Sequence, residues 1–144
     1  MSEVFTTTRR VEFSDTDTAG LIHFTCLYRF MEQAEHEWFR SLGLKVFDEQ
    51  SDGTVVSWPR VSAACDFHAP AHFEDQLTIR VSLGRLGRRS LALEYQFWRD
   101  ETPIASGAMK SVCCRIADGQ PIESIDVPEA IAAAINTAAE DGER

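Results

Sequence analysis

The chain has 144 residues, of which 44% are hydrophobic and 26% are charged, and its formal net charge is −9. These proportions are typical of an ordinary globular protein, and we expect a single domain over residues 1–144. The acidic balance argues against a general nucleic-acid binder, which needs a basic face to displace counterions. It leaves room for an anionic ligand held by a few local arginines.

Several sequence features bear on where the protein is located and whether its cysteines are reduced. No apolar run approaches the roughly 20 residues of a membrane span, and residues 1–10 contain no signal-peptide core. The four cysteines are scattered and include no C-x-x-C pair, which fits a reducing compartment and disfavours a structural zinc site. We therefore expect a cytoplasmic protein without a membrane span.

The first half of the chain predicts a strand, a loop and a long helix. Residues 4–13 are rich in Thr, Val and Phe, which favours a strand, and residues 14–22 carry loop and capping residues. A helix is predicted over residues 23–42 and is expected to stop at Gly43. Its apolar stripe is Leu27, Met31, Ala34, Trp38 and Leu42. The polar residues expected to lie mainly off that stripe are Glu32, Glu35, His36 and Arg40.

The second half predicts four strands, because apolar residues there alternate with period two. The alternating stretches are residues 61–67, 77–83, 91–97 and 112–116, and a short helix is predicted from Pro128. The breaks are short enough for antiparallel neighbours. The expected fold is therefore α+β, with a five-stranded antiparallel sheet wrapped around one long central helix and a short C-terminal helix. Such a sheet leaves edges, so self-association is expected.

Two sequence blocks carry a family resemblance. The first is Phe-x-Asp-x-Asp-x-x-Gly, formed by Phe13, Asp15, Asp17 and Gly20 ahead of the helix, and the second is residues 67–75, an aromatic-x-x-Pro-Ala-x-x-x-Asp turn. Together they resemble the 4-hydroxybenzoyl-CoA thioesterase-like group of the hot-dog superfamily, which includes short-chain acyl-CoA thioesterases of the Tol–Pal-associated type. The resemblance implies a hot-dog fold and hydrolysis of an acyl- or aroyl-CoA thioester. It also implies a homodimer or homotetramer that shares sites between subunits, with no metal and no cofactor beyond the coenzyme A of the substrate.

The resemblance also implies roles for particular residues. Asp17 matches the nucleophile or general base, and the backbone N–H of Phe24 matches the oxyanion donor. Local physics agrees, because the N–H groups of a first helical turn can stabilise an oxyanion. The alternative for Asp17 is an N-cap or an Asx turn, and for Asp15 we favour a role in stabilising the loop. Gly20 is expected to let the loop turn closely against a ligand.

Other candidates each have a plain alternative. His23 lies one place from a histidine of some relatives and either serves in proton transfer or packs at the helix entrance. Glu32 matches an acidic residue that contacts the aryl end of the substrate, or is a solvated glutamate. Arg88 and Arg89 belong to a basic cluster suited to the phosphates of coenzyme A, or form a solvated hairpin tip.

Three other functions remain open at this stage. One is a hot-dog dehydratase or hydratase, although the expected glycine- and proline-rich stretch is not found. Another is a non-catalytic module that binds acyl-CoA or an acyl carrier. The least favoured is a metal site, because its candidate ligands lack the spacing of a helical pair. Those ligands are His23, His36, His68 and His72.

Overall fold

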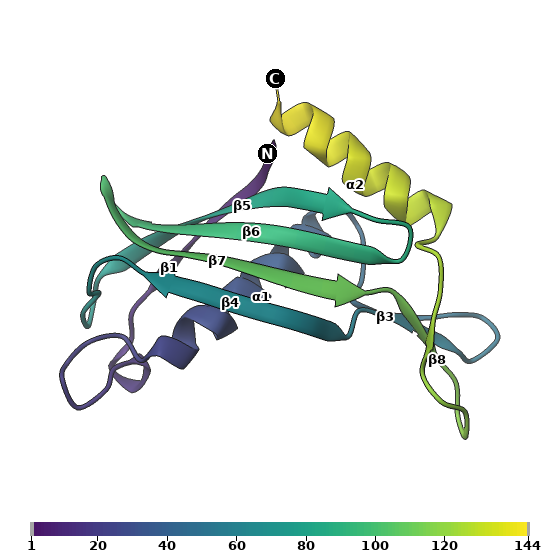
Figure 1. Cartoon of the computed structure of the whole chain (residues 1–144), viewed down its shortest axis with the longest axis horizontal. Helices are drawn as coiled ribbons and strands as arrows, with labels where there is room; N and C mark the ends of the chain where they lie inside the picture. Colours follow the sequence, from purple (N-terminus) through teal and green to yellow (C-terminus); the bar gives the residue numbers. More distant parts are fainter. Residues whose placement is uncertain (1, 144) are drawn as a thin grey trace.

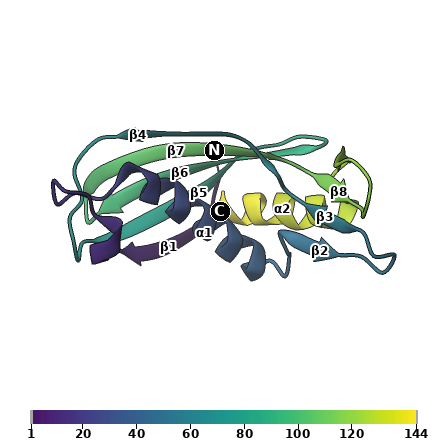
Figure 2. The ribbon, with the colours of Figure 1, turned by 90° about the horizontal axis from the view of Figure 1, so that it is seen from below.

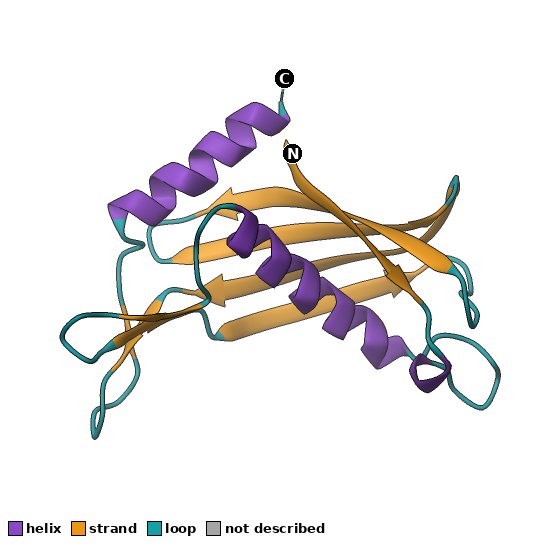
Figure 3. Cartoon of the chain, turned by 180° about the vertical axis from the view of Figure 1, so that it is seen from behind, coloured by secondary structure: helices purple, strands orange, loops and turns teal. Residues whose placement is uncertain are grey.

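The largest element of the structure, a computed structural model that describes residues 2–143, is an antiparallel sheet of five strands in the order β1-β5-β6-β7-β4. The strands are β1 (Ser2–Arg10), β4 (Arg60–Phe67), β5 (Gln76–Leu86), β6 (Ser90–Arg99) and β7 (Thr102–Val112). Helix α1 (Phe24–Ser41) crosses one face of this sheet (Figures 1 and 3).

The core lies between that sheet face and α1. Alternate residues of β5 and β6 point inward, as the period-two pattern predicted, and they meet the apolar stripe of the helix. The inward residues are almost fully buried and include Leu77, Ile79, Val81, Leu91, Leu93, Tyr95 and Phe97. Each buried large aliphatic side chain contributes about 1.5–3 kcal/mol relative to its exposed state, so this layer holds the helix against the sheet.

A second, smaller sheet and a C-terminal helix complete the fold. The small sheet has the order β2-β3-β8-β9 and lies beyond one end of the main sheet (Figure 2). Its strands are β2 (Phe47–Glu49), β3 (Val55–Ser57), β8 (Cys114–Ile116) and β9 (Glu123–Ser124). Helix α2 (Glu129–Gly142) packs on β1 and β5 and buries Ile131 and Ile135 in the common core. No helix within residues 2–143 is long and apolar enough to cross a membrane.

Several predicted elements differ from the structure. α1 has 18 residues, and His23 and Leu42 are its caps rather than helical residues. The sheet covers one side of α1 instead of wrapping around it, and residues 2–143 contain the second sheet in addition. The strand predicted over residues 112–116 was wrong as a single element. Val112 ends β7, whereas Cys114 begins β8 in the small sheet, so the alternation ran across two sheets.

Two burial predictions were also wrong. Glu35 was expected to lie off the apolar stripe, but it is only 3% exposed. It follows Met31 by one turn and precedes Phe39 by another, so it faces the sheet. In β4, Val61 and Phe67 were expected on a buried face, but they are 55% and 53% exposed. β4 is an edge strand of the sheet, which explains why this alternation does not bury one side.

Candidate active site

Asp17 lies in the loop between β1 and α1, after the short 3-10 helix η1 (Phe13–Asp15). Its Oδ1 accepts hydrogen bonds from the N–H groups of Ala19 at 2.9 Å and Leu21 at 3.2 Å. The Asx turn weighed as an alternative is therefore present. It uses only one carboxylate oxygen, because Oδ2 has no hydrogen-bond partner within residues 2–143. The loop thus anchors an exposed carboxylate and leaves one oxygen available.

Gly20 closes this loop through a left-handed backbone conformation. Its φ is +81°, and its N–H donates to the carbonyl oxygen of Asp17 at 3.0 Å. A Cβ added at Gly20 would meet no heavy atom within 4 Å. The glycine is therefore required by the backbone angle of the turn rather than by close contact within the chain.

The helix that follows begins beside Asp17. His23 is the N-cap of α1, and its Nδ1 accepts the N–H of Thr25 at 3.2 Å. Phe24 is the first helical residue, and its side chain is 57% exposed. In the described part of the chain the Phe24 N–H has no acceptor, as expected for the first turn of a helix. An unpaired donor and the positive end of the helix dipole therefore face the same region as Asp17.

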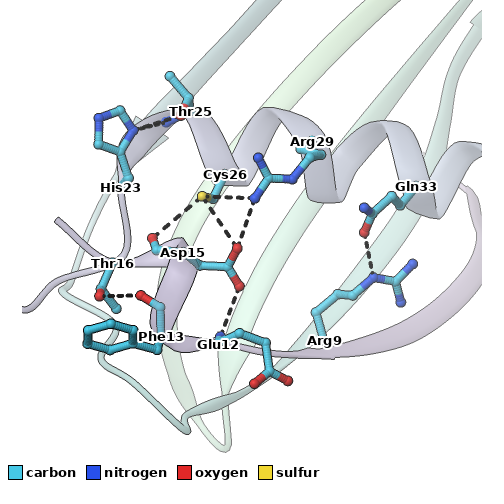
Figure 4. Close-up of polar contacts among 10 residues, drawn as sticks. All are labelled: Arg9, Glu12, Phe13, Asp15, Thr16, His23, Thr25, Cys26, Arg29 and Gln33. Carbon is cyan, nitrogen blue, oxygen red and sulfur yellow. Dashed lines mark hydrogen bonds and ion pairs between the residues drawn. The ribbon is translucent and has the colours of Figure 1, made fainter.

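Asp15 holds the loop to the helix, as the sequence analysis favoured (Figure 4). It is 6% exposed, and its Oδ2 accepts the N–H of Glu12 at 2.9 Å. Its Oδ1 accepts from Arg29 at 2.8 Å, and its backbone oxygen accepts the N–H of His23 at 2.7 Å. Cys26 lies within the same cluster, and burial raises the pKa of its thiol despite the opposing charge of Arg29.

The second block of the sequence, residues 67–75, builds the opposite wall. The Asp75 carboxylate accepts the N–H of His72 at 2.8 Å and a hydrogen bond from Arg99 at 3.0 Å. The His72 backbone hydrogen bond is the main cause of an Asp75 pKa below its ordinary value, and Arg99 adds to it. Arg99 also donates to the carbonyl oxygen of Pro70 at 2.9 Å. The predicted turn is thus held by one carboxylate and one guanidinium.

The two blocks enclose a cavity of about 490 Å³ at the N-terminus of α1. Asp17 is the one acidic side chain that lines it, and aliphatic and aromatic residues form most of its wall. Besides Asp17 the lining consists of Leu21, Ile22, Phe24, Leu27, Phe67, His68, Ala69, Pro70 and Ile104. Ile104 was missed from the sequence because it comes from β7, far along the chain. A largely apolar cavity with one carboxylate and a helix N-terminus suits a neutral acyl group with a polarised carbonyl.

The structure does not bring Glu32, Arg88 or Arg89 to this cavity. Glu32 is on the exposed side of α1, 3.8 Å from Arg60. Arg88 and Arg89 occupy the tip of the β5–β6 hairpin, where both pair with Asp126, at 3.1 and 2.8 Å. That tip lies at the end of the sheet away from the Asp17 loop (Figure 1). The length of β6 alone separates the two ends by about 30 Å.

The four histidines lie in different contacts. His68 Nε2 is 2.7 Å from Ser106 Oγ, His72 is 3.9 Å from Asp75, and His36 is 3.7 Å from Glu35. Across residues 2–143 no group of three or more side chains is arranged to hold a metal ion.

A buried ion pair between α1 and the sheet was missed from the sequence. Arg60 donates to both carboxylate oxygens of Glu35, at 2.8 and 3.1 Å, and to Ser111 Oγ at 2.8 Å. Burial and the charge of Glu35 raise the pKa of the neighbouring Tyr95 far above its ordinary value, although Arg60 opposes them. The available signal was Glu35 itself, a charged residue in register with the apolar positions of the helix.

Comparison with known proteins agrees with this geometry. A family model described as the thioesterase superfamily matches residues 19–106. A 1,4-dihydroxy-2-naphthoyl-CoA hydrolase of Prochlorococcus marinus is 33% identical over 129 residues, which cover 85% of this chain and 81% of that protein. The chain therefore belongs to the thioesterase superfamily, and it is a thioester hydrolase with the α+β hot-dog fold.

Solved structures resemble nearly the whole length of the chain. A 1,4-dihydroxy-2-naphthoyl-CoA thioesterase from Synechocystis has a TM-score of 0.78 and 26% identity, covering 97% of this chain and 98% of its own. A gentisyl-coenzyme A thioesterase has a TM-score of 0.75 and 29% identity, covering 92% of this chain and 99% of its own. The region matched by the family model begins at Ala19, two residues after Asp17.

Proposed function

We propose that this protein hydrolyses an acyl- or aroyl-CoA thioester to the free acid and coenzyme A, with Asp17 as nucleophile or general base and the Phe24 N–H as oxyanion donor. One observation carries the proposal. Asp17, with one carboxylate oxygen unpaired within residues 2–143, and Phe24, with its N–H unpaired in the same range, line one apolar cavity. The relatives named as CoA hydrolases and thioesterases support the same substrate class.

The chemistry follows from those two groups. As a general base, the Asp17 carboxylate would take a proton from water while the water oxygen attacks the thioester carbonyl. The negative charge that forms on the carbonyl oxygen would be stabilised by the Phe24 N–H and the helix dipole. The carbon–sulfur bond then breaks, and the thiolate takes the proton held by Asp17. As a nucleophile, Asp17 would instead attack the carbonyl carbon and expel the thiolate of coenzyme A, which leaves a mixed anhydride. Water would then hydrolyse the anhydride to the free acid and restore the Asp17 carboxylate.

The remaining parts of the proposal concern assembly and location. β4 is an edge strand with an exposed backbone edge and exposed apolar side chains, Val61 and Phe67 among them. Such an edge favours pairing with a second copy, so we include a homodimer or homotetramer, to be tested by sedimentation. The reaction as written needs no resident metal or redox cofactor. Four cysteines, all free, fit a reducing cytoplasm.

The test is thiol release from a panel of acyl- and aroyl-CoA thioesters, with Asp17→Asn compared with the wild type. Asp118→Asn, in an exposed turn, is the matched control. We expect Asp17→Asn to lower kcat at least about 100-fold, and the control to be unchanged. Activity that survives Asp17→Asn would refute the mechanism. Coenzyme A binding without hydrolysis would favour a binding module, and enoyl-CoA hydration without thiol release would favour a hydratase.

The arginine pair is tested separately. If Arg88 and Arg89 hold the phosphates, replacing both with alanine raises KM for an acyl-CoA but leaves KM for the matching acyl-pantetheine unchanged. Equal effects on both thioesters would reject this role. Asp126→Asn is the control, because it removes the partner of both arginines and keeps their charge.

A further inference from the structure

The side chain of His23 makes its polar contacts with Thr25 at the start of α1 (Figure 4), and within residues 2–143 no hydrogen bond joins it to Asp17. Its Nδ1 accepts the Thr25 N–H at 3.2 Å and lies 2.7 Å from Thr25 Oγ1. Its carbonyl oxygen accepts the Cys26 N–H at 2.9 Å. Its own N–H donates to the Asp15 carbonyl oxygen at 2.7 Å. The residue is thus fixed from both sides, by the loop before it and the helix after it.

His23 provides acceptors for some of the backbone N–H groups in the first turn of α1 but not for all of them. The first N–H groups of any helix have no partner inside the helix. His23 provides acceptors for the second and third of them, on Thr25 and Cys26, through its ring and its carbonyl. The first, on Phe24, is left without an acceptor within residues 2–143 and belongs to a residue that lines the cavity. One residue therefore fixes the turn and leaves a single donor free for a ligand.

The ring of His23 also orients the side chain of Phe24. The two rings are stacked, with centroids 4.8 Å apart and planes 26° apart. Nδ1 is engaged by Thr25, and a neutral ring that accepts there carries its proton on Nε2. In this position Nδ1 is not free to exchange a proton with Asp17 or with an attacking water.

We propose that His23 is a positioning residue, whose neutral imidazole caps α1 and holds the Phe24 N–H in place for the thioester carbonyl. The inference rests on the proposed function, since it takes the Phe24 N–H as the oxyanion donor. It replaces the proton-transfer role considered from the sequence with a structural one that acts through the backbone.

The experiment compares three variants by steady-state kinetics on benzoyl-CoA and butyryl-CoA at neutral pH. His23→Asn keeps a capping oxygen that does not titrate, His23→Phe keeps the stacked ring without an acceptor, and His23→Ala keeps neither. His36→Asn, on the same helix and outside the cavity, is the control. We expect His23→Phe and His23→Ala to lower kcat about 5- to 30-fold with little change in KM. His23→Asn should stay within about threefold of the wild type, because it keeps an acceptor for the Thr25 N–H.

A second readout does not depend on activity. The imidazole ¹⁵N shifts should show that the neutral ring carries its proton on Nε2 and not on Nδ1. Full kcat in His23→Phe, or a proton on Nδ1 of the neutral ring, would overturn the proposal. So would an equal loss in His23→Asn and His23→Phe, which would point to proton transfer. If the wild type hydrolyses no thioester, the proposed function fails, while the ¹⁵N shifts still decide whether His23 caps the helix.

Discussion

The buried pair of Glu35 and Arg60 predicts a large and specific loss of stability when one partner is removed. The side chains of Glu35 and Arg60 are 4% and 24% exposed, and two hydrogen bonds join them. Arg60→Met leaves the Glu35 carboxylate buried without its cation and also removes the hydrogen bond to Ser111. Breaking a buried ion pair in this way lowers the free energy of unfolding by about 3–5 kcal/mol. Because Arg60 is partly exposed, we expect a loss of about 3 kcal/mol. For 144 residues that is a fall of about 10 °C in Tm.

The assay is urea unfolding at fixed protein concentration, carried out on a double-mutant cycle. Arg60→Met, Glu35→Met and the double variant are compared with the wild type. Because an apolar pair of similar volume can replace a buried ion pair at little cost, the double variant should be more stable than Arg60→Met. A cost below about 1 kcal/mol for Arg60→Met, or a double variant no better than the single one, would refute the reasoning.

Two further changes test the contact between α1 and β1 and the loop that carries Asp17. Burial acts to raise the pKa of Glu37, but hydrogen bonds from Arg9 and Thr7 outweigh it and hold that pKa below the ordinary 4.5. Its contribution to stability is therefore present above about pH 4.5 and is lost as the pH falls through the lower folded value. Urea titrations should show Glu37→Gln less stable than the wild type at pH 7, with a difference that shrinks in acid; a constant difference would contradict this. Gly20→Ala should lower the free energy of unfolding by about 1 kcal/mol and Gly20→Asn by less, because only the left-handed backbone conformation disfavours these residues. Gly20→Val should lower the free energy of unfolding further. Thermal melts of the three variants check this order, and a neutral Gly20→Val would exclude it.

Local patterns were sufficient for the parts of the fold that depend on one element at a time. The apolar spacing of α1 and the alternation of β5 and β6 each report one buried face, so both elements could be predicted from the sequence. The role of Asp15 in the loop was also foreseeable, since a short acidic side chain before a helix pairs with nearby N–H groups. The structure of residues 112–116 could not be predicted in this way. The alternation of apolar residues continues there although the chain passes from the main sheet to the small sheet.

The misplaced residues share a physical cause, which is that their partners are distant in sequence. The Glu35 carboxylate can be buried because Arg60, 25 residues away in the sequence, supplies the opposite charge. Ile104 reaches the cavity because β7 returns beside β4. Neither contact can be predicted from the spacing of apolar residues around Glu35 or Ile104. By contrast, the motif of residues 13–20 is local, and two of its members, Asp17 and Gly20, are joined by a backbone hydrogen bond in the structure.

The position of the arginines constrains how a complete site can form. Within one chain, about 30 Å of strand separates the Asp17 end of the sheet from the hairpin of Arg88 and Arg89. If the Asp17 end and the arginine hairpin serve the same substrate molecule, they belong to different copies of the chain. The exposed edge of β4 provides a place where two copies can meet. The substrate's nucleotide and acyl portions would then depend on different subunits, so mixing an Asp17→Asn chain with an Arg88→Ala/Arg89→Ala chain should restore part of the activity that each lacks alone. No recovery in a mixture shown by sedimentation to contain mixed oligomers would place the coenzyme A phosphates elsewhere.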